Sequence, residues 1–335
     1  MINVALIGFG YWGINIARTI HNLHHCHLIT IFDTDKQKQK NAHSEYNYIE
    51  IFDDIDALIS SGAAEIAIIA TPVVSHTPIV RKCLEGGLHV LCEKVLSEEA
   101  SDIDELFQEA KNNALLLEVG FTFLYNNVVD RIAKEIHNGF PGKITYATFK
   151  RTGLGPIRTD VDVISDLASH DLSMMLYWFG EPIWVQASGI SLKNNHFYDV
   201  AFLQLGYDDG KIISIHSSWI TPIKQRIVEI VGEQGYIKFD DLNSDKLELI
   251  RFQEEYIEKN QKYGHLQYSH RSGDTIIPNI ESVPPLSNEI LNFVQKVTKN
   301  EFSPWTYSFS KSVSLIIKGV RKSLSSNGIK IYVEQ

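Results

Sequence analysis

Residues 1–35 constrain the fold more than any other part of the chain, because they combine two apolar runs, a glycine-rich turn and an acid. Residues 2–7 form an apolar run of strand length, and Gly8-Phe9-Gly10-Tyr11-Trp12-Gly13 follows directly. Apolar residues then recur at helical spacing over 14–20, and a second apolar run over 28–32 ends at Asp33. This order predicts a strand, a glycine turn, a helix and a second strand that ends in an acid.

Each part of this segment suits a bound dinucleotide. Gly8 permits a tight turn, Gly10 lets the backbone approach a pyrophosphate, and Gly13 lets the helix pack close to the strand. The helix N-terminus offers N–H groups and a partial positive charge to the phosphates. Asp33 can accept hydrogen bonds from the adenosine ribose and would repel a 2′-phosphate, so NAD is favoured over NADP. Lys36 is the nearby cation that could weaken this preference.

A glycine-rich turn in another kind of α/β protein is the alternative interpretation. A GxGxxG pattern alone is weak evidence for a nucleotide site. Here both strands, the helix and the distal acid accompany the glycines, which favours the dinucleotide interpretation.

Composition limits the classes of protein that fit. A chain of 335 residues favours two domains, because a single core rarely grows beyond about 250–300 residues. The formal net charge of −10, without a basic run, argues against nucleic-acid binding. No apolar run approaches the length of a membrane span, which is about 18 residues. The three cysteines, Cys26, Cys83 and Cys92, suggest a reducing compartment, so we expect a cytoplasmic protein.

Residues 1–120 alternate between strand-like and helix-like segments. This alternation predicts a parallel Rossmann sheet with right-handed crossovers, forming an NAD-binding domain over 1–120. Ligands bind at the carboxyl ends of the strands in such sheets. Asp33, Thr71-Pro72, Glu93-Lys94 and Gly120 all fall at expected strand ends.

The pattern changes after residue 120, and an α+β domain with a large, mostly antiparallel open sheet is expected over 121–335. Turn residues separate strand-like runs at 143–151, 183–190, 198–206, 211–219, 226–231 and 235–239. One helix is expected at 164–179, a long polar loop at 252–284, and two helices at 286–299 and 308–325. The sheet has apolar residues in both alternating sets of 212–219, so we expect it to form the interface of a homodimer or homotetramer.

Two groups of residues could carry chemistry beyond the glycine turn. Lys94 follows a strand where the nicotinamide is expected, and its ammonium could stabilise a forming alkoxide; the alternative is a surface lysine. Asp166 and His170 lie four residues apart, which places them on one face of a helix. Histidine transfers protons well at neutral pH, although a plain structural hydrogen bond is the alternative here.

The cluster His21, His24, His25, Cys26 and His27 could suggest a metal site. It joins a helix to a strand, where side chains diverge, so we expect a solvated helix end and no metal.

These segments together resemble the glucose–fructose oxidoreductase/inositol dehydrogenase (Gfo/Idh/MocA) family, over nearly the whole chain. The resemblance rests on the glycine turn, Ala70-Thr71-Pro72 with His76, the run from Gly87 to Lys94, and the D-x-x-x-H helix from Asp166 to His170. It implies that Lys94 contacts the nicotinamide ribose and the reacting hydroxyl, that His170 is the acid/base, and that Asp166 holds the substrate. The cofactor-binding residues that it implies are Gly8, Gly10, Tyr11, Trp12, Gly13, Asp33, Thr71, Pro72, His76, Glu93 and Lys94.

Two positions depart from the family pattern. The family usually has proline after the lysine, whereas this chain has Val95, so the lysine loop could have a different backbone. The family also often has histidine or asparagine near Phe121, so one polar contact could be missing.

A finer resemblance concerns the substrate. The segments 10–13, 121–126 and 155–160 are similar to bacterial family members from surface-glycan biosynthesis, which oxidise nucleotide-activated sugars, often at C3 of a UDP-N-acetylhexosamine or its uronic acid. Arg151, Arg158 and Lys150 could pair with a diphosphate or carboxylate; solvated strand-end charges are the alternative. The expected substrate-binding residues are Tyr125, Arg151, Arg158, Asp166 and His170.

The resulting hypothesis is an NAD-dependent sugar dehydrogenase. One rival is an inositol or free-sugar dehydrogenase, and another is a ketosugar reductase. A third, of a different class, is a redox-silent NAD-binding regulator, which Val95 favours and which the presence of both Lys94 and His170 disfavours.

Overall fold

The computed structural model describes residues 1–155, 161–192, 197–260, 265–301 and 305–334, and within 253–272 it describes the backbone alone. The chain divides into two compact units. Unit 1 contains Met1–Asn126 and Val283–Lys318, and unit 2 contains Asn127–Ser282 and Gly319–Glu334. Residues 283–318 therefore pack with the N-terminal part, whereas the sequence analysis placed them in a domain over 121–335.

Unit 1 is built on a parallel sheet. Its strands are β1 (Ile2–Ile7), β2 (Cys26–Phe32), β3 (Glu50–Phe52), β4 (Ile66–Ile69), β5 (His89–Glu93) and β6 (Leu117–Gly120). Its α-helices are α1 (Tyr11–Asn22), α2 (Lys36–Glu45), α3 (Ile55–Ser60), α4 (His76–Glu85), α5 (Ala100–Asn112), α8 (Pro285–Lys299) and the first part of α9 (Trp305–Ser325). Short 3₁₀ turns cover η1 (Val73–Ser75) and η2 (Thr122–Tyr125).

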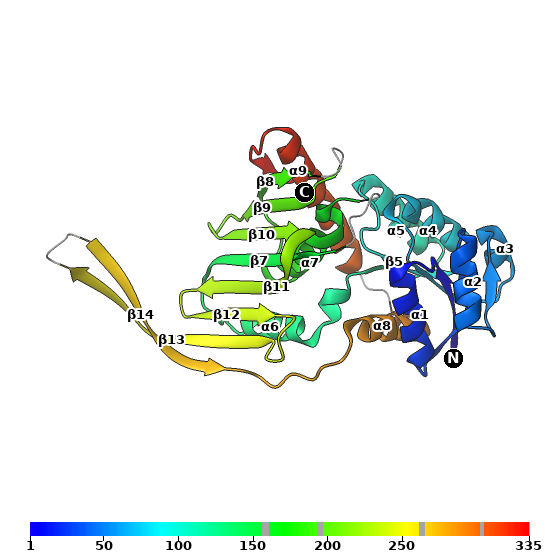
Figure 1. The fold of residues 1–335 in the computed structure, drawn as a ribbon, viewed down its shortest axis with the longest axis horizontal. Coiled ribbons are helices and arrows are strands. Elements are labelled where there is room, and N and C mark those ends of the chain that lie inside the picture. Colours follow the sequence, from blue (N-terminus) through cyan, green and yellow to red (C-terminus); the bar gives the residue numbers. More distant parts are fainter. Residues whose placement is uncertain (156–160, 193–196, 261–264, 302–304, 335) are drawn as a thin grey trace. The chain divides into compact units, whose positions relative to one another are not determined.

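The strand order β3-β2-β1-β4-β5-β6, with every pair parallel, is that of a Rossmann sheet (Figure 1). All four residues of β4 are buried, as expected for a strand covered on both faces. Helix α1 packs with α8, and α4 packs with α5. Apolar residues of α1, α8 and strands β1 and β4 belong to one core cluster, so α8 completes a core that begins at the N-terminus.

Unit 2 is built on a larger sheet. Its strands are β7 (Ile144–Leu154), β8 (Trp184–Ile190), β9 (Val200–Gly206), β10 (Ile212–Ser218), β11 (Ile220–Gly232), β12 (Gly235–Asp240), β13 (Leu247–Asn260), β14 (His265–Ile276) and β15 (Ile331–Tyr332). Its helices are α6 (Asn127–His137), a π-helical turn η3 (Ile164–Ala168), α7 (Ser169–Phe179) and the end of α9.

The order β14-β13-β12-β11-β7-β10-β9-β8-β15 runs across this sheet (Figure 1). The pair β7–β10 is parallel and the other pairs are antiparallel, which confirms the mostly antiparallel sheet expected from the sequence. One face is covered by helices: Phe149 of β7 stacks on Trp178 of α7, whose indole donates to the Val129 carbonyl of α6.

The opposite face of this sheet is open within unit 2. Along β7 and β10, buried Ala147, Phe149, Ile213 and Ile215 alternate with accessible residues. The accessible set includes large apolar side chains, because Tyr146, Phe202 and Ile212 are each 44–46% exposed. Charged and polar residues share this face, where a cavity of about 310 Å³ is lined by residues such as Lys150, His216, Glu229 and Lys238.

One expectation about local structure was wrong. The polar segment 252–284 is not one long loop, because β13 and β14 pair as an antiparallel ribbon that extends past β12 (Figure 1). Before helix α5, which begins at Ala100, the Ser97 hydroxyl accepts from the Glu99 N–H and donates to Asp102.

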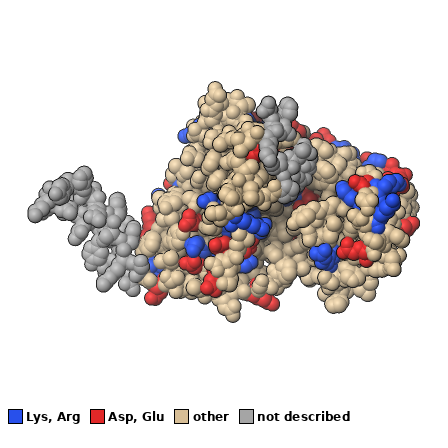
Figure 2. All heavy atoms as spheres, viewed as in Figure 1, with Lys and Arg blue, Asp and Glu red and all other residues tan. Residues whose placement is uncertain are grey.

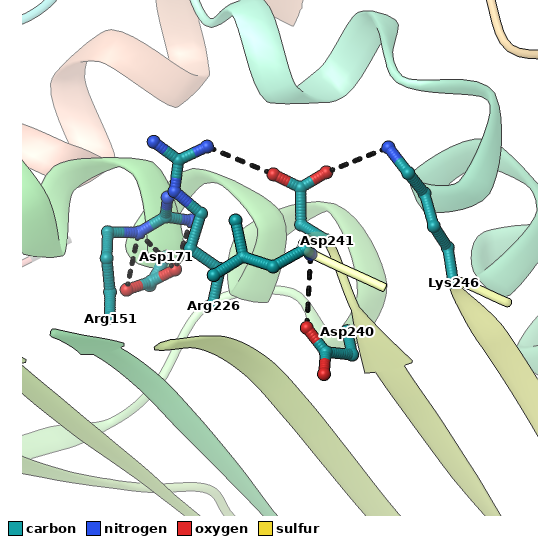
Figure 3. Close-up of polar contacts among 7 residues, drawn as sticks. Arg151, Asp171, Arg226, Asp240, Asp241 and Lys246 are labelled. Atoms are coloured by element: carbon teal, nitrogen blue, oxygen red, sulfur yellow. Dashed lines mark hydrogen bonds and ion pairs between the residues drawn. The ribbon is translucent and has the colours of Figure 1, made fainter. Parts of the chain in front are cut away.

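A buried ion pair fixes α7 to the sheet. Arg151 of β7 binds Asp171 of α7 through Nε and Nη2, with N–O distances of 2.7–3.1 Å, and both side chains are at most 7% exposed. Burial raises the pKa of Asp171, and the charge of Arg151 opposes that shift. Arg226 lies beside the pair and binds Asp241, which also binds Lys246 (Figure 3).

On the visible face of the molecule, Lys and Arg are interspersed with Asp and Glu, and no extended basic surface is seen there (Figure 2). Among the described residues, no helix is both long and apolar enough to cross a membrane.

We predict that Asp171→Ala lowers the free energy of unfolding by about 3–5 kcal/mol, because it leaves the buried Arg151 charge without its partner. Chemical denaturation measures this loss. As a control, Asp209→Ala removes the ion pair of Lys211 with Asp209, whose side chain is 43% exposed, and should cost less than about 1 kcal/mol. Equal losses in the two variants would contradict the role assigned to the buried pair.

Candidate functional site

The glycine turn after β1 has a steric reason at two of its three glycines. Gly8 has a φ of +100°, and a Cβ there would lie 2.7 Å from the Ala70 carbonyl oxygen. A Cβ on Gly13 would lie 2.0 Å from the Gly8 carbonyl oxygen, so α1 can approach the turn only without a side chain. A Cβ on Gly10 would meet no atom within 4 Å, so the protein itself does not require glycine at this position.

Asp33, directly after β2, is joined to the same turn. Its Oδ2 accepts from the Phe9 N–H at 2.8 Å and its Oδ1 from the Asp35 N–H at 2.9 Å. A carboxylate has about four acceptor positions, so two remain for ribose hydroxyls. Lys38 lies 3.7 Å from Asp33, whereas Lys36 pairs with Asp53. The cation closest to the acid is thus Lys38, not Lys36 as the sequence suggested.

This turn fits the dinucleotide that the sequence predicts. Gly10 is the residue before α1, so no side chain at this position caps the helix N-terminus. The first turn of α1 contains no acidic residue. The N–H groups of that turn are therefore available to an anion, and no acidic side chain of the turn itself repels it. The open space at Gly10 is where a pyrophosphate could approach the backbone. The side chains of Tyr11 and Trp12 are 87% and 37% exposed beside it.

The ends of β4 and β5 are connected through His76. Its Nδ1 lies 2.9 Å from the Val95 carbonyl oxygen and its Nε2 lies 2.8 Å from the Thr71 carbonyl oxygen. The ring is 1% exposed, so His76 supports the backbone around Pro72 and Lys94 instead of offering its side chain to a ligand. The Lys94–Val95 peptide bond is cis.

Glu93 connects the lysine loop to the glycine turn, because its Oε1 accepts a hydrogen bond from the Trp12 indole. Burial raises the pKa of the Glu93 carboxyl to about 7, and the charge of Lys94 and the Trp12 hydrogen bond oppose this shift. A carboxyl with such a pKa exchanges its proton near neutrality. Perturbed groups of this kind are frequent in functional sites.

In unit 2, Asp166 and His170 lie where the π-helical turn η3 passes into α7. Asp166 Oδ2 accepts from the Trp219 indole at 3.3 Å. The Ser173 hydroxyl donates to the His170 carbonyl at 2.7 Å. Single π-helical turns inside α-helices occur frequently at functional sites. The sequence placed both residues on one regular helix and did not reveal the π-helical turn.

The start of this helix is firmly held. Asp162 Oδ1 accepts from the N–H groups of Ile164 and Ser165, at 3.1 and 3.0 Å. Arg321 of α9 donates to the Ser165 hydroxyl at 3.0 Å. The Arg151–Asp171 pair anchors the residue that follows His170. His170 therefore extends from a backbone fixed on both sides, which suits a group that must present a nitrogen in a defined direction.

Three residues that the sequence suggested as substrate contacts, Arg151, Tyr125 and Arg158, differ in what the structure shows around them. Arg151 is buried against Asp171, so its packing does not support a substrate contact. Burial raises the pKa of the Tyr125 phenol, and the nearby Glu118 carboxylate adds to this shift. Arg158 lies outside the described residues. Lys150, which was considered with them, is on the open face of the sheet.

Sequence reasoning missed several residues around these groups. Glu118 and Glu289 are buried acids at β6 and α8, and Asp162 and Asp171 hold the helix of His170. Nothing in the local sequence around Glu289 indicates that α8 returns to unit 1. Among the described residues, no group of three His, Cys, Asp or Glu side chains is arranged to hold a metal ion.

Two family models match the chain. Residues 2–121 match the model described as "Oxidoreductase family, NAD-binding Rossmann fold", and residues 132–238 match the Gfo/Idh/MocA C-terminal domain. Together these matches cover most of the chain, including the glycine turn, Lys94 and His170.

Curated relatives are similar at moderate identity. Myo-inositol 2-dehydrogenase of Thermotoga maritima is 24% identical over 254 residues, covering 72% of this chain and 76% of the relative. UDP-N-acetylglucosamine 3-dehydrogenase of Acidithiobacillus ferrooxidans is 25% identical over 219 residues, covering 65% and 67%. The solved structure of an A. ferrooxidans UDP-N-acetylglucosamine 3-dehydrogenase superposes with a TM-score of 0.80 at 20% identity, covering 97% of this chain and 98% of that one.

We predict that alanine at Gly10 weakens NAD binding, whereas alanine at Gly13 lowers the stability of the fold. Gly10→Ala should change stability by less than about 1 kcal/mol, because its Cβ meets open space. It should weaken NAD binding by at least about tenfold, because the methyl group occupies the approach of the pyrophosphate. Gly13→Ala should lower stability by about 1–3 kcal/mol or more through its clash with Gly8. Thermal unfolding and calorimetric titration with NAD measure both, and unchanged NAD affinity in Gly10→Ala would refute the assigned pyrophosphate position.

Proposed function

This chain belongs to the Gfo/Idh/MocA oxidoreductase family, and on that basis we propose that it oxidises a secondary hydroxyl of a nucleotide-activated sugar. Its coarser activity is that of an NAD-dependent sugar dehydrogenase. The observation that carries the finer proposal is the similarity to a UDP-N-acetylglucosamine 3-dehydrogenase in both sequence and fold. The expected substrate is a UDP-N-acetylhexosamine or its uronic acid, oxidised at C3, in surface-glycan biosynthesis.

Each candidate residue has a defined part in this proposal. Bound NAD supplies the hydride acceptor at the nicotinamide ring. His170 accepts the proton of the reacting hydroxyl, and the Lys94 ammonium stabilises the negative charge that develops on that oxygen. Asp166 orients the substrate. General acid–base assistance of this kind contributes about 10²–10⁴ in rate.

A second candidate is an inositol or free-sugar dehydrogenase, which the similarity to myo-inositol 2-dehydrogenase favours. The two candidates share the same chemistry and differ in whether a nucleotide is attached to the sugar. A screen of NADH formation with UDP-N-acetylhexosamines, their uronic acids, inositols and free sugars separates them. Turnover of inositols or free sugars with no turnover of nucleotide sugars would overturn the first proposal in favour of the second.

We predict that Lys94→Ala and His170→Ala each lower kcat by at least about 10² while NAD affinity stays within a few-fold. His170→Ala should also remove the acidic limb of the pH–rate profile, because an imidazolium does not accept the substrate's proton. Lys94→Arg should not restore activity, because a planar guanidinium does not replace a compact ammonium at one oxygen.

Matched controls for these variants are Lys111→Ala and His43→Ala, which change exposed residues of the same types in unit 1. Steady-state kinetics and NAD titration of all variants provide the measurement. If a Lys94→Ala/His170→Ala double variant turns over as fast as the wild type, these catalytic roles are wrong.

We further propose that the open face of the unit 2 sheet binds a second copy of the chain. Tyr146, Phe202 and Ile212 expose apolar surface there, next to side chains of both charge signs. Exposed apolar patches of this kind commonly mark association. A face that carries both signs can pair with itself across a two-fold axis.

We predict that the protein has at least a dimeric mass at micromolar concentration, and that Phe202→Glu with Ile212→Glu shifts it to a monomer. Val74→Glu is the control, because Val74 is 81% exposed and belongs to unit 1, whereas the sheet belongs to unit 2. Light scattering coupled to size exclusion measures the mass. A monomeric wild type, or a dimer that the two sheet substitutions leave intact, would rule out this interface.

A further inference from the structure

Two carboxyls contact the turn that follows β6: that of Glu93, which is half-buried, and that of Glu289, which is 1% exposed. A Cβ on Gly120 would lie 3.3 Å from Glu93 Oε1, so the Glu93 carboxyl packs directly against this glycine. Two residues later, the Thr122 hydroxyl donates to Glu289 Oε2 at 2.8 Å. Residues 120–122 therefore contact both Glu93 of β5 and Glu289 of α8. Strand β5 and helix α8 are nearly two hundred residues apart in the sequence.

A third carboxyl belongs to the same cluster. Glu118 lies two residues before Gly120, on the same face of β6, and it is fully buried. Its Oε1 accepts from Lys296 of α8 at 2.7 Å. Lys296 follows Glu289 by seven residues, so both lie on the face of α8 that meets β6.

The cluster has more carboxyls than cations. Lys296 is committed to Glu118, and among the described residues Glu289 Oε1 and Glu118 Oε2 have no hydrogen-bond partner. Glu289 is 1% exposed, and the buried Ile290 and Phe293 are its neighbours on α8. An ionised, unpaired carboxylate is costly in such surroundings, whereas a protonated carboxyl is not.

The pKa directions agree with this geometry. Burial raises the pKa of Glu289 well above its usual value, and the charges of Glu93 and Glu118 add to the shift while the Thr122 hydrogen bond opposes it. Burial also raises the pKa of Glu118, against the pull of Lys296. The other titratable groups that face the cluster are Cys92 and Lys94 of β5 and Tyr125 after β6.

Glu93 connects this cluster to the glycine turn through its hydrogen bond from Trp12. Trp12 is the residue before Gly13 and lies in the first turn of α1, where the pyrophosphate is expected. A charge on Glu93 is therefore close enough to a bound dinucleotide for the two to influence each other in a partly buried environment.

We propose that Glu93 and Glu289 share a titrating proton in the free chain, and that an anionic dinucleotide bound at the glycine turn raises the fraction of chains in which that proton is bound. The proposal rests on the cofactor site of the proposed function. The proton comes from solvent and returns to it on release. Glu289 thus acts as a positioning residue that contributes to cofactor affinity without touching the cofactor.

The direction of the proton exchange follows from charge. The pyrophosphate carries negative charge, so its arrival disfavours a second negative charge on the pair, and the pair takes up a proton. Because the two carboxyls interact, they titrate as a unit, and removing either one abolishes the shared titration near neutrality.

The test is calorimetric titration of the chain with ADP-ribose, which carries the pyrophosphate and lacks the nicotinamide, at pH 7 in buffers of different ionisation enthalpy. The dependence of the measured enthalpy on the buffer gives the number of protons taken up. The wild type should take up a fraction of a proton for each ADP-ribose bound. Glu93→Gln and Glu289→Gln should each reduce this uptake to less than about a third.

The matched control is Glu99→Gln, an exposed acid close to β5, which should keep the wild-type uptake. Thr122→Val is a second variant that keeps both carboxyls and removes one hydrogen bond that favours the charged form of Glu289. It should move the pH of maximum uptake upward. An infrared difference spectrum, bound minus free, should show an increased band from protonated carboxyl in the wild type and not in Glu289→Gln.

Each outcome is decisive. Uptake that is absent in the wild type between pH 6 and pH 8, or equal in wild type and Glu289→Gln, overturns the proposal while leaving the cofactor site intact. A wild-type chain that does not bind ADP-ribose at all refutes the cofactor site itself. Uptake lost in both Gln variants and kept in Glu99→Gln supports the shared proton.

Discussion

The approach of α1 to the glycine turn is the contact on which the rest of unit 1 depends. It is possible only because Gly13 has no Cβ, which would lie 2.0 Å from the Gly8 carbonyl oxygen. This approach brings Trp12 to Glu93, and Asp33 accepts the Phe9 N–H in the same turn. One steric condition therefore aligns three strand ends, β1, β2 and β5, around a helix N-terminus. A nucleotide site needs such an arrangement, because the charge of the phosphates is met by N–H groups rather than by flexible side chains.

Much of this could be predicted from the sequence, because local patterns determine local geometry. The glycine spacing, the apolar run that ends at Asp33 and the strand that ends at Glu93 each specify an element within a few residues of its observed bounds. The residue range of helix α8 was also predicted nearly in full, but its packing in unit 1 was not. A helix shows in its sequence which face is apolar, but not which distant sheet that face will cover. Glu118 and Glu289 were missed for this reason.

The error at β13–β14 and the unforeseen partner of Arg151 have a similar origin. The segment 252–276 is polar and was interpreted as a loop, whereas strand pairing satisfies its backbone without an apolar pattern. Arg151 was expected to bind substrate because positive charge beside a catalytic helix suits an anionic ligand. Its partner, Asp171, is part of the helix itself, and only the register of β7 against α7 reveals that the two meet. A charge in a sequence indicates a need for a partner but does not identify that partner.

The buried acids also determine how stability depends on pH. Burial raises the pKa of Glu93, Glu118, Glu289 and Asp171, so the folded chain holds protons that the unfolded chain releases. The stability associated with these groups is therefore greatest at low pH and falls as the pH rises through their usual values, 3.8 for Asp171 and 4.5 for the glutamates, and for Glu93 on towards about 7. The exposed acids Asp53, Asp104 and Asp209 have lowered pKa values and act in the opposite sense, but solvent screens their pairs. The stability that these groups contribute is thus lower near neutrality, and the two carboxyls proposed to share a proton, Glu93 and Glu289, belong to this set.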